Sequence, residues 1–294
     1  MTKSEEAEMK AMPKIDMTKV ANLEALDGAT RKSVNSMAAN LKESDRRKNK
    51  RKFNFQQAMA FQLPSGGKFY QDSQDEDLKN GIIKLYPFSL AEEEIITNKT
   101  LLKNGSMFRV LFDTCMASNY QAEKLLQFDA LYIMYVLRQI SYGDDYNFEV
   151  QCGKCEGKFE YTMNISDIEW EELPEDVTDE HVIQLPVSGY TVTMRLMRLG
   201  MEEAQDNIKH KYGCGDKVAT LISNTTSIVD DNGEEVIPED WADFFEALPT
   251  MDRNTINKAF AGTKQEPKIT IHCPECGEEI TFNIPISEDF FRIS

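Results

Sequence analysis

Residues 148–165 of this chain read FEVQCGKCEGKFEYTMNI. Residues 269–286 read ITIHCPECGEEITFNIPI, and at a constant offset they repeat the first stretch. Both stretches alternate apolar and polar residues, pass through a Cys-x-x-Cys turn with a glycine in or after it, and alternate again. This pattern predicts two β-hairpins, each with a pair of cysteines at its tip.

The spacing of the four cysteines indicates a metal site that the two hairpins share. One Cys-x-x-Cys turn supplies two thiolates, whereas a structural zinc ion takes four ligands in a tetrahedron. The sequence therefore predicts one structural zinc ion per chain, with Cys152, Cys155, Cys273 and Cys276 as ligands. Four protein ligands leave no position for water or substrate, so such an ion stabilises the fold and does not catalyse a reaction.

Other interpretations of the cysteines stay open. Four thiolates also suit iron, and His272 is an alternative ligand beside Cys273. The pairs could also be metal-free or redox-active dithiols, although neither motif begins a helix after a strand, as a thioredoxin-like motif does. Cys115 and Cys214 lie outside both motifs, and we interpret them as core or surface thiols.

The chain is strongly acidic, and its charge is unevenly distributed. The net charge is −17 over 294 residues, but residues 1–55 carry 13 Lys and Arg against 8 Asp and Glu, which leaves 20 against 42 in the remainder. This balance argues against a general nucleic-acid binder, because neutralising phosphates requires clustered cations. No signal peptide or membrane-spanning run is recognisable, so we expect a protein made in the cytosol without membrane contact.

Residues 1–55 are predicted to be a basic, poorly structured arm, because they contain few large apolar side chains. The basic residues cluster near the end of the arm as Arg46, Arg47, Lys48, Lys50, Arg51 and Lys52. This cluster is a candidate partner-binding site for an acidic protein surface or for nucleic acid, and a solvated charge run is the alternative.

The remainder of the chain predicts an α+β fold, with helical bundle elements, short β-hairpins and a split zinc-ribbon-like knuckle pair with four cysteines. We divide it into a mixed β/helical domain (56–147), a first zinc hairpin (148–166), an inserted α+β segment (167–268) and a second zinc hairpin with an aromatic C-terminal tail (269–294). In the tail, Phe290 and Phe291 are expected to pack or to contact a partner, because two adjacent aromatic rings are unfavourable in water.

Two local patterns add detail. Ser89 and Glu92 have the spacing of a capping box, which predicts a helix that continues to about Lys103. Gln184-Leu185-Pro186 repeats Gln62-Leu63-Pro64. The segment between the hairpins is therefore predicted to repeat part of the layout that precedes the first hairpin.

No catalytic constellation is recognisable in the sequence. It contains no Gly-x-Ser-x-Gly, no phosphate-binding glycine-rich loop and no His-Glu-x-x-His. The histidines His181, His210 and His272 have no partner at a catalytic spacing. We therefore expect a non-enzymatic protein.

The order of these features is similar to that of a known family. The features are the Leu63-Pro64-Ser65-Gly66 turn, the helix with Leu90-Ala91-Glu92-Glu93-Glu94, the Asn104-Gly105 break, Ser141-Tyr142-Gly143, both Cys-x-x-Cys motifs and Phe290-Phe291. Together, over roughly residues 61–294, they resemble the baseplate hub proteins of contractile-tailed phages of the T-even type.

The resemblance implies a virion or tail-assembly component in a hetero-oligomeric assembly, with other baseplate and tail proteins as partners. It implies a location in the host cytoplasm during assembly and then in the tail baseplate. Both a permanent hub subunit and a transient assembly factor fit it.

The alternative function is a zinc-ribbon nucleic-acid-binding adaptor that uses the basic cluster of residues 46–52 as its contact. Acidic residues surround the predicted zinc hairpins, namely Glu156, Glu160, Glu275, Glu278 and Glu279. They count against this alternative because they would repel phosphates.

Overall fold

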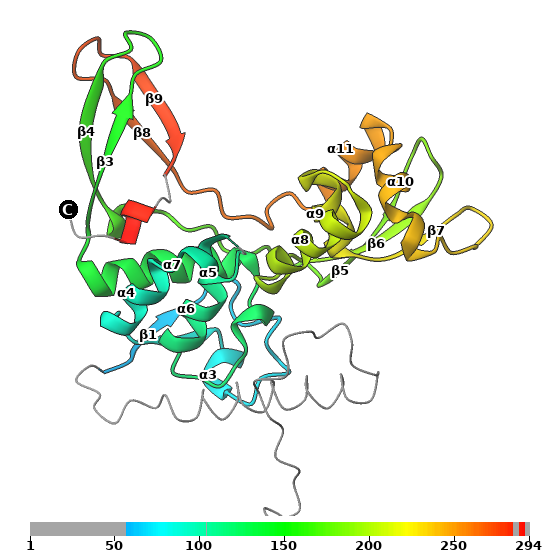
Figure 1. Ribbon diagram of the computed structural model, residues 1–294, viewed down its shortest axis with the longest axis horizontal. Helices are drawn as coiled ribbons and strands as arrows, with labels where there is room; N and C mark the ends of the chain where they lie inside the picture. The colour runs from blue at the N-terminus through cyan, green and yellow to red at the C-terminus, as the bar shows by residue number, and fades with distance from the viewer. Residues whose placement is uncertain (1–56, 104, 285–287, 292–294) are drawn as a thin grey trace, which may run out of the picture. The chain divides into compact units, whose positions relative to one another are not determined.

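The computed structural model describes residues 57–103, 105–284 and 288–291. Helices and small antiparallel sheets follow one another along this part of the chain, which confirms the predicted α+β class (Figure 1). The predicted arm and its basic cluster lie outside the described residues. Within them, no helix combines the length and the apolar character that crossing a membrane requires.

All sheets of the described residues are antiparallel and small. The strands are β1 (Met59–Gln62), β2 (Ile82–Leu85), β3 (Asp145–Gln151), β4 (Lys158–Asn164), β5 (Glu180–Gln184), β6 (Thr191–Arg195), β7 (Thr225–Val229), β8 (Lys268–His272) and β9 (Glu279–Asn283). β1 pairs with β2, β3 with β4 and β8 with β9, while β5, β6 and β7 form one three-stranded sheet.

Helices supply the rest of the described structure. The α-helices are α3 (Glu76–Lys79), α4 (Leu90–Ile96), α5 (Lys99–Lys103), α6 (Met107–Cys115), α7 (Gln127–Tyr142), α8 (Gly200–Tyr212), α9 (Asp216–Asn224), α10 (Trp241–Glu246) and α11 (Thr250–Ala259). Short 3-10 turns are η3 (Ala122–Lys124), η4 (Ile165–Asp167), η5 (Pro238–Asp240) and η6 (Glu288–Phe291).

The prediction of one helix from Ser89 to about Lys103 is wrong, because the structure has two shorter helices there. The capping box is present, since the backbone N–H of Ser89 donates to Glu92 Oε2 at 2.9 Å. However, α4 ends at Ile96, and the side chain of Asn98 then accepts the N–H groups of Thr100 and Leu101. An asparagine that accepts in this way begins a new helix, so the chain continues as α5.

One apolar cluster surrounds α7, which is buried on most of its sides. α7 presents Ile133, Tyr135 and Leu137 to this cluster, and each is at most 1% exposed. β1, β2, α4 and α6 contribute to the same cluster, as do the bases of both Cys-x-x-Cys hairpins. The hairpins are therefore anchored on the most deeply buried helix of the cluster.

The aromatic tail packs into this cluster. The ring of Phe290 lies 4.9 Å from the ring of Tyr135 and 5.0 Å from that of Tyr146, and Phe291 contacts Phe88. Phe290 and Phe291 are only 0% and 4% exposed. We therefore assign both rings to the core of the chain and not to a surface that a partner could reach.

A second apolar cluster lies on one face of the β5-β6-β7 sheet, with α9, α10 and α11. Ile183, Val192 and Ile228 occupy paired positions across the three strands and are all buried. The indole N–H of Trp241 donates to the carbonyl of Val236 at 2.9 Å, which satisfies the polar atom of this large core residue. Cys214 belongs to this cluster and Cys115 to the first one.

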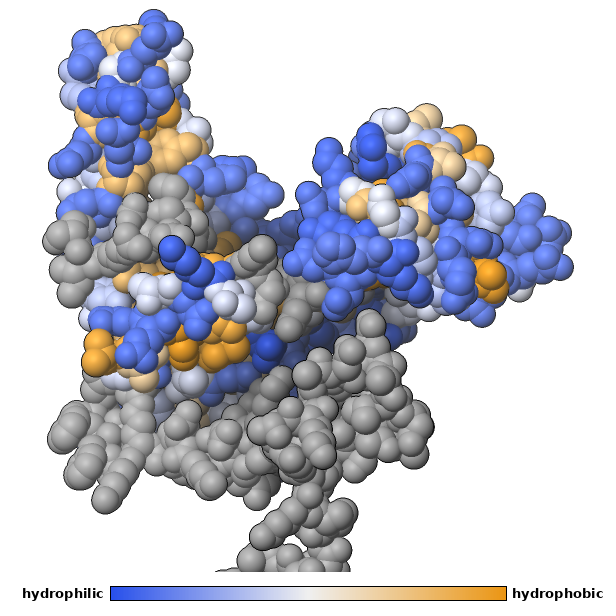
Figure 2. Space-filling model, viewed as in Figure 1, coloured by the Kyte–Doolittle hydropathy of each residue, from blue (hydrophilic) through white to orange (hydrophobic). Residues whose placement is uncertain are grey.

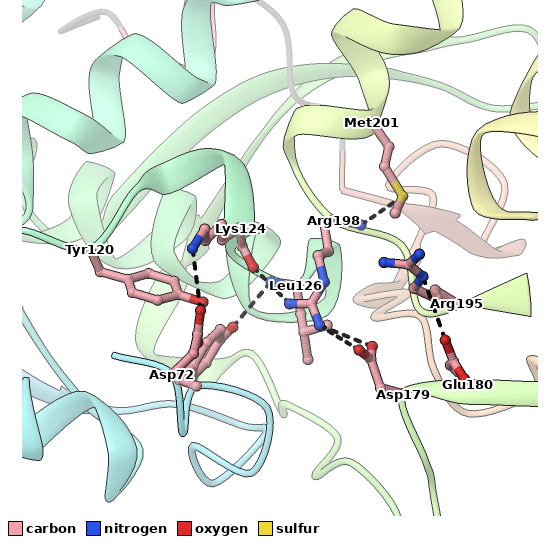
Figure 3. A network of polar contacts seen from close by, with 10 residues as sticks. Asp72, Tyr120, Lys124, Leu126, Asp179, Glu180, Arg195, Arg198 and Met201 are labelled. Carbon is pink, nitrogen blue, oxygen red and sulfur yellow. Dashed lines mark hydrogen bonds and ion pairs between the residues drawn. The ribbon is translucent and has the colours of Figure 1, made fainter. Parts of the chain in front are cut away.

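Polar contacts join η3 to the start of α8 (Figure 3). Arg198 donates to both carboxylate oxygens of Asp179 at 2.9 Å and to the carbonyl of Lys124 at 2.8 Å. The ammonium group of Lys124 pairs with Asp72 at 3.3 Å. Backbone pairing of Leu126 with Arg198 runs alongside these contacts. Arg198 thus ties three separate segments together.

Replacing Arg198 by alanine is expected to lower the free energy of unfolding by about 1–3 kcal/mol, because hydrogen bonds to charged groups in partly buried positions are lost. Arg195 is the matched control, since it pairs with Glu180 at 3.8 Å and is half exposed. Arg195→Ala should cost at most about 0.5 kcal/mol. Urea unfolding of both variants measures the difference, and equal costs would contradict it.

Candidate metal centre

Both predicted hairpins are present. β3 and β4 pair from Asp145 with Asn164 to Gln151 with Lys158, and β8 and β9 pair from Lys268 with Asn283 to His272 with Glu279. The Cys-x-x-Cys motifs form the two connecting turns, as the alternating pattern predicted.

The two turns have the same backbone hydrogen bonds. In the first, Cys152 N donates to Gly157 O at 2.9 Å and Glu156 N donates to Cys152 O at 3.0 Å; in the second, Cys273 N donates to Glu278 O at 2.8 Å and Gly277 N donates to Cys273 O at 2.9 Å. We call each of these turns a knuckle. The repeat in the sequence is therefore a repeat in backbone geometry.

The knuckles differ at one strained position. Glu156 has a φ of 61°, and the equivalent residue of the second knuckle, Gly277, has a φ of 72°. The left-handed region costs a residue with a side chain about 1–2 kcal/mol, whereas glycine enters it freely. The first knuckle thus carries strain that the second avoids.

Replacing Glu156 by glycine is expected to raise the free energy of unfolding by about 0.5–1 kcal/mol, since the relief of strain exceeds the added entropy of the unfolded chain. The reciprocal change, Gly277→Glu, should lower it by about 1–2 kcal/mol. Chemical denaturation of both variants under the same metal conditions tests the pair. A loss of stability in Glu156→Gly would show that its side chain makes a contact that outweighs the strain.

The fold brings the four predicted cysteines together. Their sulfur atoms all lie within 4.8 Å of one another. The distance between the sulfurs of Cys152 and Cys276 is 3.7 Å, and the distance between those of Cys155 and Cys273 is also 3.7 Å. Four sulfurs at the usual zinc–sulfur distance of about 2.3 Å from one ion are about 3.8 Å apart. The cluster therefore has the dimensions of a tetrahedral thiolate site, and His272 is not part of it.

Backbone donors in the first knuckle favour the thiolate that binds a metal. The N–H groups of Cys155 and Lys154 lower the pKa of Cys152 to about 7, and the Lys154 N–H lies 3.4 Å from the Cys152 sulfur. A thiolate is the form in which cysteine binds metals. The backbone of the turn therefore favours the thiolate of Cys152, whereas at Cys155 and Cys276 the backbone donors are outweighed by burial and the neighbouring cysteines, which raise the pKa values.

Contacts away from the sulfurs hold the hairpins against each other. The rings of Phe148 and Phe282, one from each hairpin, are 5.7 Å apart. Near the tips, Lys154 pairs with Glu278 at 2.6 Å, although both side chains are largely exposed and such pairs contribute little. The apolar contact lies near the hairpin bases and the thiolates lie at the tips, so the hairpins meet along their length.

Arg138 positions the first hairpin and was not recognised from the sequence. It lies in α7, is 3% exposed, and donates to the carbonyls of Gly143 and Asp145 at 2.5 and 2.6 Å. Its guanidinium also lies over the rings of Tyr142 and Tyr146. The only signal in the sequence was a lone arginine in the apolar stretch 128–140.

Two facing Cys-x-x-Cys hairpins on an α+β scaffold define a protein with a four-cysteine knuckle pair. The family follows from comparison with known proteins. A family model described as T4 bacteriophage base plate protein matches residues 57–292. The chain belongs to this family, and it is a structural component of a phage baseplate. No curated protein and no solved structure matches the chain.

Proposed function

We propose that this protein is a non-enzymatic component of the baseplate hub, which docks to other tail proteins and is stabilised by one structural zinc ion. The observation that supports the zinc ion is the cluster of four cysteine sulfurs, which all lie within 4.8 Å of one another. Membership of the baseplate family supports a location in the virion and an association with other tail proteins.

A closed tetrathiolate site supports a structural role for the metal. All four ligands come from the protein, so no position is available for an activated water molecule. When bound, zinc would be held by Cys152 and Cys155 from one hairpin and by Cys273 and Cys276 from the other. It would cross-link positions up to 124 residues apart in sequence.

The surroundings of the knuckles argue against the nucleic-acid adaptor. Glu156, Glu275 and Glu279 are exposed near the cysteines. Phosphate groups would be repelled there. The basic cluster Arg46–Lys52 lies outside the described residues, and we propose that it contacts an acidic surface of a neighbouring tail protein.

The test measures where the protein is during assembly. An assembly extract from a phage mutant that lacks this protein is supplemented with the purified full chain, and completed tails are isolated and analysed by mass spectrometry. We expect tails to form only with the added chain. Retention in finished tails identifies a hub subunit, whereas loss after assembly identifies an assembly factor. Tail formation without the protein would refute the proposal.

A further inference from the structure

The chain contains two structurally related halves. Each half has a strand that ends at the glutamine of Gln-Leu-Pro, an antiparallel partner strand, several helices, and a last helix that precedes a Cys-x-x-Cys hairpin. The halves differ in that α3 lies between β1 and β2, whereas a short turn joins β5 to β6 and a third strand, β7, extends the second sheet. In the first half these elements begin at β1 and end at β4; in the second they begin at β5 and end at β9. The two halves therefore share the Gln-Leu-Pro turn and the last helix before each knuckle, but not the whole order of elements.

The turns at the two Gln-Leu-Pro sequences correspond in part. Leu63 and Leu185 occupy the same position and are both buried. Gly67 and Gly189, each four residues further on, have φ angles of 79° and 80°. Such positive angles favour glycine. The two turns thus share Leu-Pro and one glycine with a positive φ. They differ at the residue before that glycine, since Gly66 has a φ of 64° and its counterpart Ser188 has no positive φ. Their hydrogen bonds also differ, because Gly66 N donates to Leu63 O whereas Gly189 N donates to Leu185 O.

An aspartate from the last helix of each half holds the turn. Asp129 is the third residue of α7, and Asp252 is the third residue of α11. Asp129 accepts the N–H of Ser65 at 3.0 Å. Asp252 accepts the N–H groups of Val187 and Ser188, both at 2.8 Å. We call these two structures the first and the second aspartate-held turn.

An extended segment of the chain covers the first aspartate-held turn. Leu173 N donates to the carbonyl of Pro64 at 3.1 Å, and the ammonium of Lys68 donates to the carbonyls of Glu175 and Val177. Val177 is buried in the adjacent cluster. The segment 173–177 thus contacts this turn through its backbone, and its Val177 side chain is buried in the cluster to which Leu63 of the turn belongs.

The second aspartate-held turn lacks such a cover among the described residues. Val187 is 54% exposed, whereas its equivalent Ser65 is 7% exposed; Met251 is 65% exposed, whereas its equivalent Phe128 is 3% exposed. Within the same part of the chain, no backbone N–H donates to the carbonyl of Pro186, the counterpart of Pro64. On the face that Figure 2 shows, the surface over α8–α11 is mainly hydrophilic, and Val182 and Ile237 are the other large apolar side chains that are exposed among the described residues of 180–259.

We propose that the second aspartate-held turn, with Val187 and Met251, is a docking surface for an extended segment of another tail protein. The segment binds as residues 173–177 bind the first turn: a backbone N–H donates to the carbonyl of Pro186, and an apolar side chain covers Val187 and Met251. We infer an extended segment because residues 173–177, which contact the first aspartate-held turn, belong to no helix or strand and bond through their backbone. Two exposed apolar side chains around an unused carbonyl match an extended peptide better than the face of a helix, whose N–H groups are already bonded.

The test rests on the proposed function and uses the full chain in the assembly extract that lacks it. The double variant Val187→Gln/Met251→Gln removes the apolar surface without adding charge. The control Val182→Gln/Ile237→Gln changes two side chains that are 72% and 56% exposed and belong to the same part of the chain. We expect the first variant to lower the yield of tails by about tenfold and the control to match the wild type. Thermal unfolding should be the same in all three proteins, because the changed side chains are exposed.

A photo-reactive side chain at position 187 identifies the occupant. Cross-linking during assembly should join it to one segment of another tail protein, and a synthetic peptide of that segment should bind the wild type about tenfold more tightly than the Val187→Gln/Met251→Gln variant. Normal tail yield from this variant, a cross-link to a second copy of this chain, or a peptide that does not bind would each overturn the proposal. Failure of the wild type itself to restore tails would instead refute the hub function.

Discussion

Replacing Cys276 by serine is expected to abolish stoichiometric zinc binding and to lower the free energy of unfolding by about 4–10 kcal/mol. Two effects set this range. Structural zinc in small domains binds with about 10 kcal/mol or more at neutral pH. A cross-link that closes a loop of about 100 residues also removes about 4–5 kcal/mol of chain entropy from the unfolded state. The loss exceeds that of an ordinary core substitution because the ion joins two distant hairpins.

Cys276 is the best ligand to replace because it is exposed, so the serine creates no cavity. Cys214→Ser is the control for metal content, since Cys214 lies in the second apolar cluster and outside the cluster of four cysteines. Elemental analysis of the purified wild type should give about one zinc per chain, in the control as well, and much less in Cys276→Ser. Iron in place of zinc would correct the identity of the metal. No metal in the wild type, or no effect of a strong chelator on its thermal unfolding, would contradict the zinc site.

Short-range patterns explain why the cluster of four cysteines could be predicted. The hairpins depend on alternation over a few residues, and the knuckles depend on the spacing within each Cys-x-x-Cys. Shared ligation followed from the need for four ligands, because each hairpin supplies only two. The structure confirms the α+β class and the convergence of Cys152, Cys155, Cys273 and Cys276. The metal itself, the domain boundaries and the role of the basic arm stay predictions.

Long-range contacts explain what the sequence did not reveal. Asp129 meets Ser65 across 64 residues, and Asp252 meets Val187 across 65 residues, so no local pattern marks either carboxylate. The Gln-Leu-Pro repeat indicated related turns but not the residues that hold them. Likewise, the aromatic pair Phe290-Phe291 has the same sequence whether it packs inside the chain or binds a partner. Only the positions of Tyr135 and Tyr146 show that it packs inside.

Replacing Asp129 by alanine is expected to lower the free energy of unfolding by about 3–5 kcal/mol. The carboxylate has no exposed surface and accepts the hydroxyl of Tyr70 as well as the N–H of Ser65. The hydroxyl of Tyr70 in turn accepts the N–H of Leu126 at 3.1 Å. Alanine would leave two buried donors without an acceptor, and each such group costs about 1–3 kcal/mol.

A double-mutant cycle distinguishes the contribution of the Tyr70–Asp129 hydrogen bond from a simple loss of packing. Tyr70→Phe should cost about 1–3 kcal/mol, because Leu126 N loses its acceptor. The double variant Tyr70→Phe/Asp129→Ala should be more stable than the sum of the single losses predicts, by about 1 kcal/mol or more, because the Tyr70 donor is gone when its acceptor is removed. Urea unfolding of the four proteins gives this coupling, and strict additivity would show that the hydrogen bond contributes nothing.

The two aspartate-held turns should respond to pH in opposite directions. Burial raises the pKa of Asp129 above 3.8, because the hydrogen bonds from Ser65 and Tyr70 do not compensate for it. Burial also acts on Asp252, but the N–H groups of Val187 and Ser188 outweigh it and lower the pKa below 3.8. The contribution of Asp129 is therefore fully present below pH 3.8 and is lost as the pH rises through its raised pKa. That of Asp252 is present above pH 3.8 and is lost as the pH falls.

Asparagine variants expose this difference, since asparagine does not ionise. With rising pH, the stability of the wild type relative to Asp129→Asn should fall, whereas its stability relative to Asp252→Asn should rise. Each variant differs from the wild type at one aspartate only, so the effects of the other titrating groups cancel in each comparison. Equal slopes would mean that both aspartates have the same ionisation in the folded chain. Opposite slopes would show that the two carboxylates differ in the folded chain. Burial would disfavour the ionised form of Asp129, and backbone N–H donors would stabilise that of Asp252.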